Sequence, residues 1–526
     1  MLLSTRRRVF EAAFVVMLLN ILSKILGLTR EQIFAMFFGA TGQLDAKVAA
    51  ERITSAITVL SGPVSTTFLP VLAGYAARGD SEGAKRITSS IVSLSMVLVL
   101  AMAALVIIPA PHVVRLLSPG FGEDTLASAT LLTRVLLPAM VFPLLSAFGK
   151  SVLNTYGSFG IPAFAPSLQN MVIIAAASLF GPVMGVRSLA IGFPLAYLAA
   201  FALHIPAWKR SPAWPSFSVR WDESTKKVIF MAVPIILGSI CGQLYILANL
   251  NLASRLPEGS VAALSLADRL RQFPLGFFAV AVTTVLFPTL SGMWAKGDKE
   301  GFRAATVNGI RFVEFVCIPA AVGLMVLAEP IVRLVYQRGA FTPQHTALTA
   351  AALTAYAPAI AGMAAQSVTT FVFYSSQETR VPVALSVGTA LLNIILDALL
   401  SRPLGLVGLA LAHSISVTAG SLVGLYLLKR MLSGLALGPL AGSVLRALAS
   451  SVIMGAGAVL VSRYTGFAAG SGSLVRDALA GGISIAVSGV IYVLASHVFR
   501  SEEISMVFGL VKQRLGARFG RDRSES

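Results

Sequence analysis

Several ionisable residues lie inside long apolar stretches of this chain of 526 residues, where a charge is costly, and seven of them are candidates for binding a ligand. They fall into two groups, with Lys24, Arg30, Asp45 and Arg52 in the first part of the chain and Asp268, Arg269 and Arg271 in the second. Charges placed within a bilayer usually face a polar cavity or one another. A guanidinium group binds phosphate oxygens through two parallel hydrogen bonds and stays charged at any relevant pH. We therefore expect a cavity that binds an anionic headgroup, most naturally a diphosphate.

Some of the charges within the apolar stretches, inside and outside this set of seven, have a simpler explanation. Arg30 stands next to Glu31 and can form a local ion pair with it. Asp45 can sit at the membrane surface, where a charge is unremarkable. Arg311 and Glu314 are three residues apart, so we expect them to pair on one helix face.

An internal repeat places the two groups at matched positions. Residues 66–83 (TTFLPVLAGYAARGDSEG) and 284–301 (TVLFPTLSGMWAKGDKEG) share nine of eighteen positions at an offset of 218. Arg52 precedes Pro70 by 18 residues, and Arg269 precedes the equivalent Pro288 by 19. We interpret the chain as two equivalent lobes that present guanidinium groups at similar depth, a plan associated with alternating access.

The composition requires a membrane to position these charges. The chain is 56% hydrophobic and 12% charged with a mean hydropathy of +0.81, whereas soluble domains have roughly 25% charged residues. At about 20 apolar residues per crossing, it holds about fourteen spans. We predict an all-α membrane protein with two six-helix lobes around a central cavity and two extra C-terminal helices. The expected parts are 1–208 and 224–430 for the lobes, 209–223 for an interlobe linker, 437–498 for the extra spans and 501–526 for a cytoplasmic amphipathic tail.

Charge and motif content exclude other classes. The net charge is +18, but Lys and Arg are scattered between apolar runs, which favours contacts with membrane lipids over nucleic-acid binding. Their alternation along the loops places both termini in the cytoplasm. No Walker motif or paired carboxylate motif occurs, so we expect a protein without enzymatic activity. Any uphill transport would use an ion gradient or the membrane potential.

Several ordered motifs resemble the MurJ (MviN) lipid II flippase family. In the first lobe they are SKILGLTRE at 23–31, FGA at 38–40, LDA at 44–46 and FLPVLAGY at 68–75. In the second they are ADRL at 267–270, FP at 273–274, LFPTL at 286–290 and RGAFT at 338–342.

The resemblance implies the multidrug/oligosaccharidyl-lipid/polysaccharide exporter fold in a bacterial inner membrane. It places the family's cavity basic residues on Lys24, Arg30 and Arg269 and its motif aspartate on Asp45. It also implies that the last two spans form a groove for the polyprenyl tail. A sodium site known in some members maps to Asn249, Asn393 and Asp397.

The first-lobe motif departs from the family pattern. Residues 46–52 read AKVAAER where the family has an aromatic pair followed by Pro-Asn-Leu-Leu-Arg, and Thr58 occupies the position of the final arginine. On the strength of the resemblance, the leading hypothesis is a flippase for lipid II, the undecaprenyl-diphosphate-linked disaccharide-pentapeptide, working with cell-wall synthesis or division proteins. The changed motif leaves alternatives open. The alternatives are a flippase for another polyprenyl-diphosphate oligosaccharide and an inactive scaffold.

Overall fold

Long apolar segments form helices because only a helix satisfies every backbone N–H and C=O within the segment when water is absent. The computed structural model describes residues 2–504 apart from residues 60, 436 and 471. Within this part of the chain the secondary structure is α-helical with one 3₁₀ turn and no strand. The all-α prediction is confirmed. Beyond residue 504, the predicted amphipathic tail lies outside the described residues.

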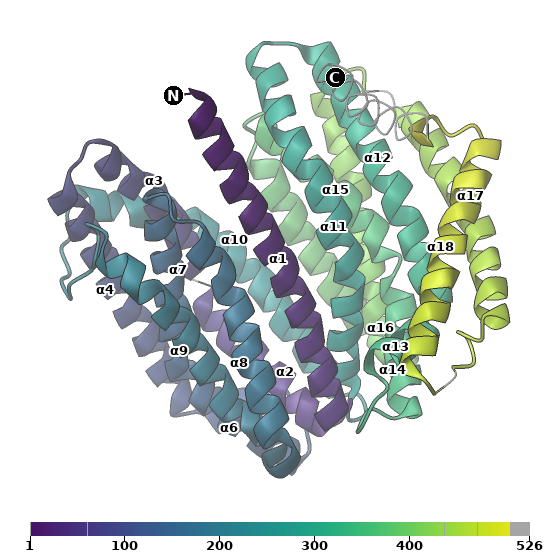
Figure 1. Cartoon of the computed structure of the whole chain (residues 1–526), viewed down its shortest axis with the longest axis horizontal. Coiled ribbons are helices and arrows are strands. Elements are labelled where there is room, and N and C mark those ends of the chain that lie inside the picture. The colour runs from purple at the N-terminus through teal and green to yellow at the C-terminus, as the bar shows by residue number, and fades with distance from the viewer. Residues whose placement is uncertain (1, 60, 436, 471, 505–526) are drawn as a thin grey trace, which may run out of the picture. The chain divides into compact units, whose positions relative to one another are not determined.

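The helices form two compact units, the first of which contains Met1–Ala263 together with Tyr336–His345. Its helices α1 to α9 fill most of the predicted first lobe, and α10 follows the linker (Figure 1). Their bounds are α1 Leu2–Phe38, α2 Gly42–Thr58, α3 Ser61–Ala77, α4 Ser81–Ile107, α5 Ala110–Leu117, α6 Glu123–Ala139, α7 Val141–Thr155, α8 Gly160–Met184, the 3₁₀ turn Gly185–Arg187, α9 Ser188–Lys209 and α10 Glu223–Ser254.

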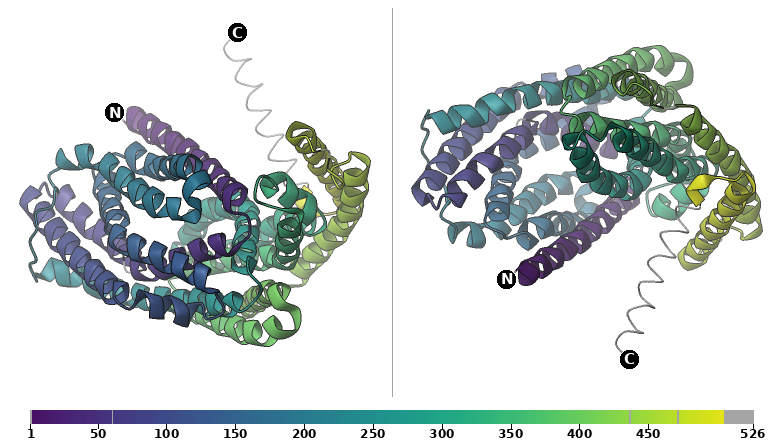
Figure 2. Two further views of the ribbon diagram at one scale, coloured as in Figure 1. Left: turned by 90° about the horizontal axis from the view of Figure 1, so that it is seen from below. Right: turned by 90° about the horizontal axis from the view of Figure 1, so that it is seen from above.

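The second unit contains Leu264–Val335 and Thr346–Ser526. Its last two helices, α17 and α18, pack side by side in both views of Figure 2, and α17 also packs on α12. The bounds are α11 Ser260–Ala295, α12 Lys299–Val326, α13 Ala328–Tyr336, α14 Pro343–Tyr356, α15 Ala359–Ser375, α16 Arg380–Met431, α17 Leu437–Tyr464 and α18 Leu474–Val498.

The boundary between these units differs from the one expected between the lobes. The repeat places α10 at the start of the second lobe, but α10 packs on α2, α3 and α5 and so belongs to the first compact unit. The compact units are therefore defined by helix contacts, and their boundary does not coincide with the boundary between the sequence repeats. The division into lobes stays a prediction that rests on the repeat.

The repeated sequence takes the same local structure at both sites. Gly79 and Gly297 have positive φ angles of 70° and 74°, which only glycine adopts readily. The next residues, Asp80 and Asp298, cap α4 and α12 by accepting hydrogen bonds from the N–H groups of Gly83 and Gly301 at 2.7 and 2.8 Å. At both sites the Gly-Asp-x-Glu-Gly pattern therefore ends one helix at the glycine and starts the next helix at the aspartate cap.

Nine helices in the described part of the chain are long and apolar enough to cross a membrane. One of them, α16, folds back on itself at Gly405, whose backbone leaves the helical region, and the Asn393 amide lies 2.8 Å from Ser416 Oγ across the hairpin. It therefore offers two crossings. The charged helices α1 and α11 lie outside the nine, so the total of fourteen stays a prediction.

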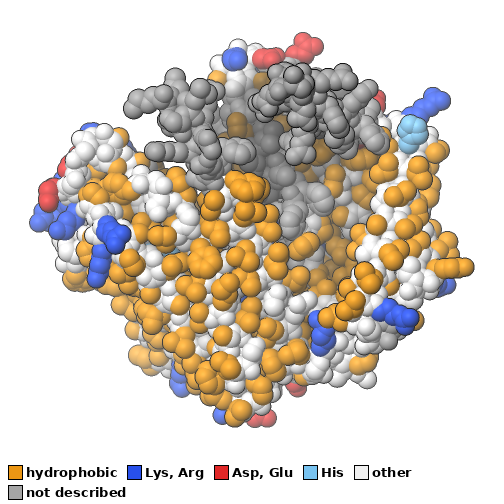
Figure 3. Space-filling view, viewed as in Figure 1, with side chains coloured by type: hydrophobic (Ala, Val, Ile, Leu, Met, Phe, Trp, Pro, Cys, Tyr) orange, Lys and Arg blue, Asp and Glu red, His pale blue; other side chains and the backbone are white. Residues whose placement is uncertain are grey.

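The surface agrees with a lipid environment. Over the face drawn in Figure 3, hydrophobic side chains cover most of the described surface, and Lys and Arg gather near its margins. Large apolar side chains are exposed along the outer helices; Leu105, Leu179 and Leu460 are examples. An apolar exposed surface of this extent is typical of a protein solvated by lipid.

Candidate substrate site

A cluster of four charges lies buried where α1 meets α2 in the first unit. Arg30 Nη2 is 2.6 Å from Glu31 Oε1, which confirms the expected local ion pair. Lys47 Nζ lies 3.6 Å from Glu31 Oε2 and 3.0 Å from Glu51 Oε2, and its side chain is 2% exposed. Both cations also lie near the ring of Phe34, which is itself fully buried. Two cations and two carboxylates balance, so this cluster by itself is neutral.

Arg30 is held by a second helix as well. Its Nη1 donates to Asn170 Oδ1 at 3.1 Å, and the Asn170 amide donates to the carbonyl of Ser23 at 3.2 Å. Its Nε has no hydrogen-bond partner among the described residues. The guanidinium is therefore fixed in position, and its Nε is a buried donor that no described residue satisfies. Asn170 is a functional candidate that the sequence reasoning missed, although an amide inside an apolar span is a visible signal.

Arg52 and Lys24 are the two further cations predicted for the site in this unit. Arg52 Nη1 donates to Asn249 Oδ1 on α10 at 3.3 Å, and its side chain is half-buried. Lys24 lies on α1 and is exposed. Asn249, a candidate for the sodium site, thus already holds a guanidinium.

Asp45 has a different position from the one expected of a headgroup ligand. Its carboxylate is 2% exposed and accepts the N–H groups of Gly259 and Ala262, both at 2.6 Å, at the start of α11. In return Glu258 accepts the N–H of Gly42 at 2.6 Å, at the start of α2. Each helix start is therefore capped by a carboxylate from the other, which satisfies N–H groups that a helix leaves unpaired.

The RGAFT motif at 338–342 also has a structural position in the first unit. The N–H of Ala340 donates to the carbonyl of Met36 at 2.8 Å, close to the FGA motif at the end of α1. Gly339 has φ +58°, and a Cβ there would lie 2.4 Å from the Met36 carbonyl oxygen. Two family motifs separated by about 300 residues thus meet, and glycine is required at their contact.

In the second unit, Asp268 and Arg271 form an ion pair within α11. Arg271 Nε donates to Asp268 Oδ1 at 3.1 Å, and its guanidinium lies 5.4 Å from the ring centre of Tyr356. Arg271 is 4% exposed, whereas Arg269 between them in sequence is exposed. The three predicted residues are therefore together, and Arg269 is the one that projects toward solvent.

Asn393 and Asp397 lie one turn apart on α16 and are both buried. With its amide nitrogen turned toward the carboxylate, Asn393 donates to Asp397 Oδ2 at 2.8 Å, and its oxygen accepts from Ser416 at 2.8 Å. In this orientation the Asp397 carboxylate offers the hard oxygen ligands that a small cation prefers, whereas the Asn393 amide oxygen is turned toward Ser416. The sodium site at these residues stays a prediction.

Arg311 does not pair with Glu314 as expected from their spacing. Its Nε and Nη2 donate to Glu503 Oε1 at 2.7 Å and to Glu502 Oε2 at 2.8 Å, in the segment that follows α18. Ser443 on α17 donates to the same Glu503 oxygen at 2.6 Å. The prediction was wrong because two charge-assisted hydrogen bonds, to Glu502 and Glu503, are stronger than a pair between residues three apart on one helix face.

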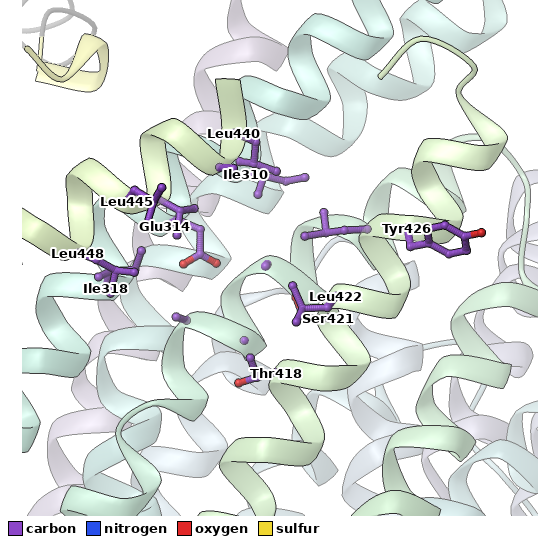
Figure 4. A pocket seen from close by; sticks show the side chains of 16 residues that line it. Ile310, Glu314, Ile318, Thr418, Ser421, Leu422, Tyr426, Leu440, Leu445 and Leu448 are labelled. Atoms are coloured by element: carbon purple, nitrogen blue, oxygen red, sulfur yellow. The ribbon is translucent and has the colours of Figure 1, made fainter. Parts of the chain in front are cut away.

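Glu314 faces an apolar cavity of about 560 Å³ (Figure 4). The cavity lies between α12, α15, α16 and α17, and Leu440, Leu445 and Leu448 line its α17 side. The cluster around Arg311 and Ser443 ties together the two helices that form two of its walls.

Replacing Glu503 with glutamine is expected to lower the free energy of unfolding by about 3 kcal/mol, because Arg311 would keep a buried charge with only a weak partner. Burial alone would raise the pKa of the Glu503 carboxyl, but hydrogen bonds from Ser443, Ser501 and Arg311 outweigh it and lower this pKa from 4.5 to about 2. Because the folded-state pKa is depressed, the stabilisation is complete above the ordinary pKa and is lost as the pH falls from about 4.5 to about 2.

Thermal unfolding of the purified protein in detergent measures both effects. Glu502→Gln is the matched control, since Glu502 is 67% exposed and its pair with Arg311 should contribute less than about 1 kcal/mol. Equal shifts in Tm for the two variants would contradict this account.

Comparison with known proteins places these residues in context. The sequence model described as "Lipid II flippase MurJ" matches residues 34–476. The chain belongs to the MurJ lipid II flippase family. A "Probable lipid II flippase MurJ" of Vibrio cholerae is 30% identical over 424 residues, covering 78% of this chain and 81% of the relative. That of Bdellovibrio bacteriovorus is 30% identical over 512 residues, covering 95% and 97%.

The fold agrees with this membership. A solved structure of "Lipid II flippase MurJ, inward closed conformation" has a TM-score of 0.77 at 25% identity and covers 93% of this chain and all of the solved chain. A multidrug resistance MATE family transporter of the MOP superfamily has a TM-score of 0.70 at 16% identity, covering 80% of this chain and 98% of its own, which shows the shared fold alone. The exporter fold predicted from the motifs is confirmed.

Proposed function

We propose that this protein flips lipid II, the undecaprenyl-diphosphate-linked disaccharide-pentapeptide, from the cytoplasmic to the outer leaflet of the bacterial inner membrane by alternating access. The observation that carries the proposal is the arrangement of arginines at the family's positions within apolar helices. Arg30 is held in position by Glu31 and Asn170, and Arg269 is exposed on α11 beside the ion pair of Asp268 and Arg271.

The basic residues supply the chemistry that a diphosphate needs. Lys24, Arg30 and Arg52 are the headgroup ligands of the first unit, and Arg269 is that of the second. Asp268 and Arg271 position Arg269 by fixing the turn of α11 around it. Asp45 acts through the start of α11 rather than by touching the substrate.

The polyprenyl tail would lie along α17 and α18. Leu445, Val452 and Leu460 on α17 are 65–67% exposed, and Leu479 and Val490 on α18 are about as exposed. An isoprenoid chain can pack along such a surface through van der Waals contacts, which drive association between apolar groups inside a bilayer. The expected coupling is to sodium at Asn393 and Asp397 or to the membrane potential. Cell-wall synthesis or division proteins are the expected protein partners.

A second candidate function is the transport of another polyprenyl-diphosphate oligosaccharide. Thr58 stands where the family pattern has an arginine, and its hydroxyl donates to the carbonyl of Ser55 at 3.0 Å, so it brings no charge to a headgroup. Fewer cations in the first unit favour a headgroup of different shape or charge.

Complementation of a bacterium depleted of its lipid II flippase tests the proposal. We expect the chain to restore growth and to bring lipid II to the outer leaflet, where it is measured directly. A protein that is well expressed and inserted but restores neither would refute the proposal, and restored growth without translocated lipid II would favour a scaffold.

A further inference from the structure

The segment 216–220, which joins α9 to α10, is fastened to α4 by a regular set of hydrogen bonds. The N–H groups of Ser216, Ser218 and Arg220 donate to the hydroxyls of Ser89, Ser93 and Ser90 at 3.0, 3.1 and 3.2 Å. Alternate backbone N–H groups are thus used on one side of the segment. In an extended chain, successive side chains point to opposite sides, so the segment has two faces of different character.

The inner face borders a polar cavity of about 150 Å³ against the first two turns of α4. A water molecule takes up about 30 Å³ of liquid, so the cavity has room for a phosphate group. Three basic side chains and three serine side chains line it together with one carboxylate; they are Lys85, Arg86, Arg220, Ser89, Ser216, Ser218 and Glu82. This composition is that of an anion site.

The cations of this cavity are incompletely neutralised. Arg86 Nε lies 3.6 Å from Asp222 Oδ2, a distant pair between two partly exposed side chains. Lys85 and Arg220 form no ion pair within the part of the chain that the structure describes. Their charge is available to a ligand, and the serine hydroxyls can donate to the same oxygens.

The outer face of the segment is apolar and exposed. Phe217, Val219 and Trp221 are 74%, 51% and 57% exposed. Tryptophan is enriched at the level where lipid headgroups meet the acyl chains, so Trp221 suits that level and the apolar Phe217 and Val219 can enter it beside Trp221. The basic cavity matches the phosphate of a phospholipid, and the apolar face beside it matches the upper part of the acyl chains.

We propose that the cavity between α4 and residues 216–220 binds the phosphate of an anionic phospholipid headgroup, with Phe217, Val219 and Trp221 inserted beside it at the membrane interface. Lys85 and Arg220 hold the phosphate oxygens. This site is separate from the residues assigned to the transported headgroup, and it ties the segment between α9 and α10 to the membrane surface. Basic pockets between membrane helices commonly bind lipid phosphates in this way.

Titration calorimetry on the purified full chain in a nonionic detergent tests the site. The probes are dihexanoyl phosphatidylglycerol, dihexanoyl phosphatidylcholine and inorganic phosphate. In the double variant Lys85→Gln/Arg220→Gln, the Kd for the phosphatidylglycerol should rise about 30-fold. Each basic residue removed is expected to raise this Kd roughly fivefold. The matched control Lys226→Gln/Lys227→Gln removes the same charge from the exposed start of α10 and should leave this Kd within about twofold.

The source of the phosphate is tested in the same titrations. A third variant, Phe217→Ser/Trp221→Ser, should raise the Kd for the phosphatidylglycerol and leave the Kd for inorganic phosphate unchanged. This result would support a lipid as the ligand. An equal Kd for phosphate and the lipid would overturn the lipid, and equal binding of phosphatidylcholine would overturn the anionic headgroup. An equal loss of phosphatidylglycerol affinity in Lys85→Gln/Arg220→Gln and in the control Lys226→Gln/Lys227→Gln would overturn the site itself. Thermal unfolding confirms that each variant is folded.

Discussion

Arg269→Ala and Arg30→Ala are each expected to abolish complementation of a flippase-depleted strain while the protein remains folded in the membrane. A hydrogen bond to a charged group contributes about 1.5–3 kcal/mol, so the rate of lipid II translocation should fall roughly 10- to 100-fold. Arg269 is exposed, and removing Arg30 leaves Glu31 with Lys47 at 3.6 Å. Arg269→Ala therefore acts on substrate contact. Arg30→Ala also breaks a buried ion pair, so its translocation rate is compared with wild type at equal amounts of folded protein.

Arg402→Ala serves as the control for these variants. Arg402 is an exposed arginine near the turn of the α16 hairpin, outside both groups of site residues. Its replacement should leave translocation unchanged at equal protein level. If Arg30→Ala and Arg269→Ala also support growth, the assignment of a diphosphate to these arginines is wrong.

Asp45→Ala is expected to lower the free energy of unfolding by about 3 kcal/mol and to abolish complementation through the loss of folded protein. The substitution leaves the buried N–H groups of Gly259 and Ala262 without their acceptor, and each unsatisfied group costs about 1–3 kcal/mol. The midpoint of thermal unfolding and the amount of protein in the membrane measure this effect.

Asp80→Ala is the matched control, because Asp80 caps a helix in the same way but at an exposed position. Its loss should cost only about 1 kcal/mol. If Asp45→Ala abolished translocation with no change in Tm, Asp45 would act on the substrate and the capping role would be wrong.

The sequence predicted those features that depend on local pattern or on repetition. Apolar run length predicted the helices, and the repeated Gly-Asp-x-Glu-Gly segment predicted equivalent positions, which the structure shows as matching helix starts at Asp80 and Asp298. The pair of Arg30 with Glu31 was visible because the two residues are adjacent.

Other features depend on contacts between residues far apart in sequence. Arg311 meets Glu502 and Glu503 across 191 and 192 residues, and Asp45 meets Gly259 across 214. Spacing along one helix cannot reveal such partners, and it suggested Glu314 for Arg311 instead. A motif residue such as Asp45 can therefore be recognised from sequence while its role depends on what the fold brings to it.

The rate at which purified protein moves lipid II across proteoliposome membranes tests the central claim most directly. We predict that wild-type protein makes lipid II accessible at the opposite leaflet much faster than empty vesicles do, and that the double variant Arg30→Ala/Arg269→Ala is close to empty vesicles. A wild-type rate no higher than that of empty vesicles, or a double variant as fast as wild type, would contradict it.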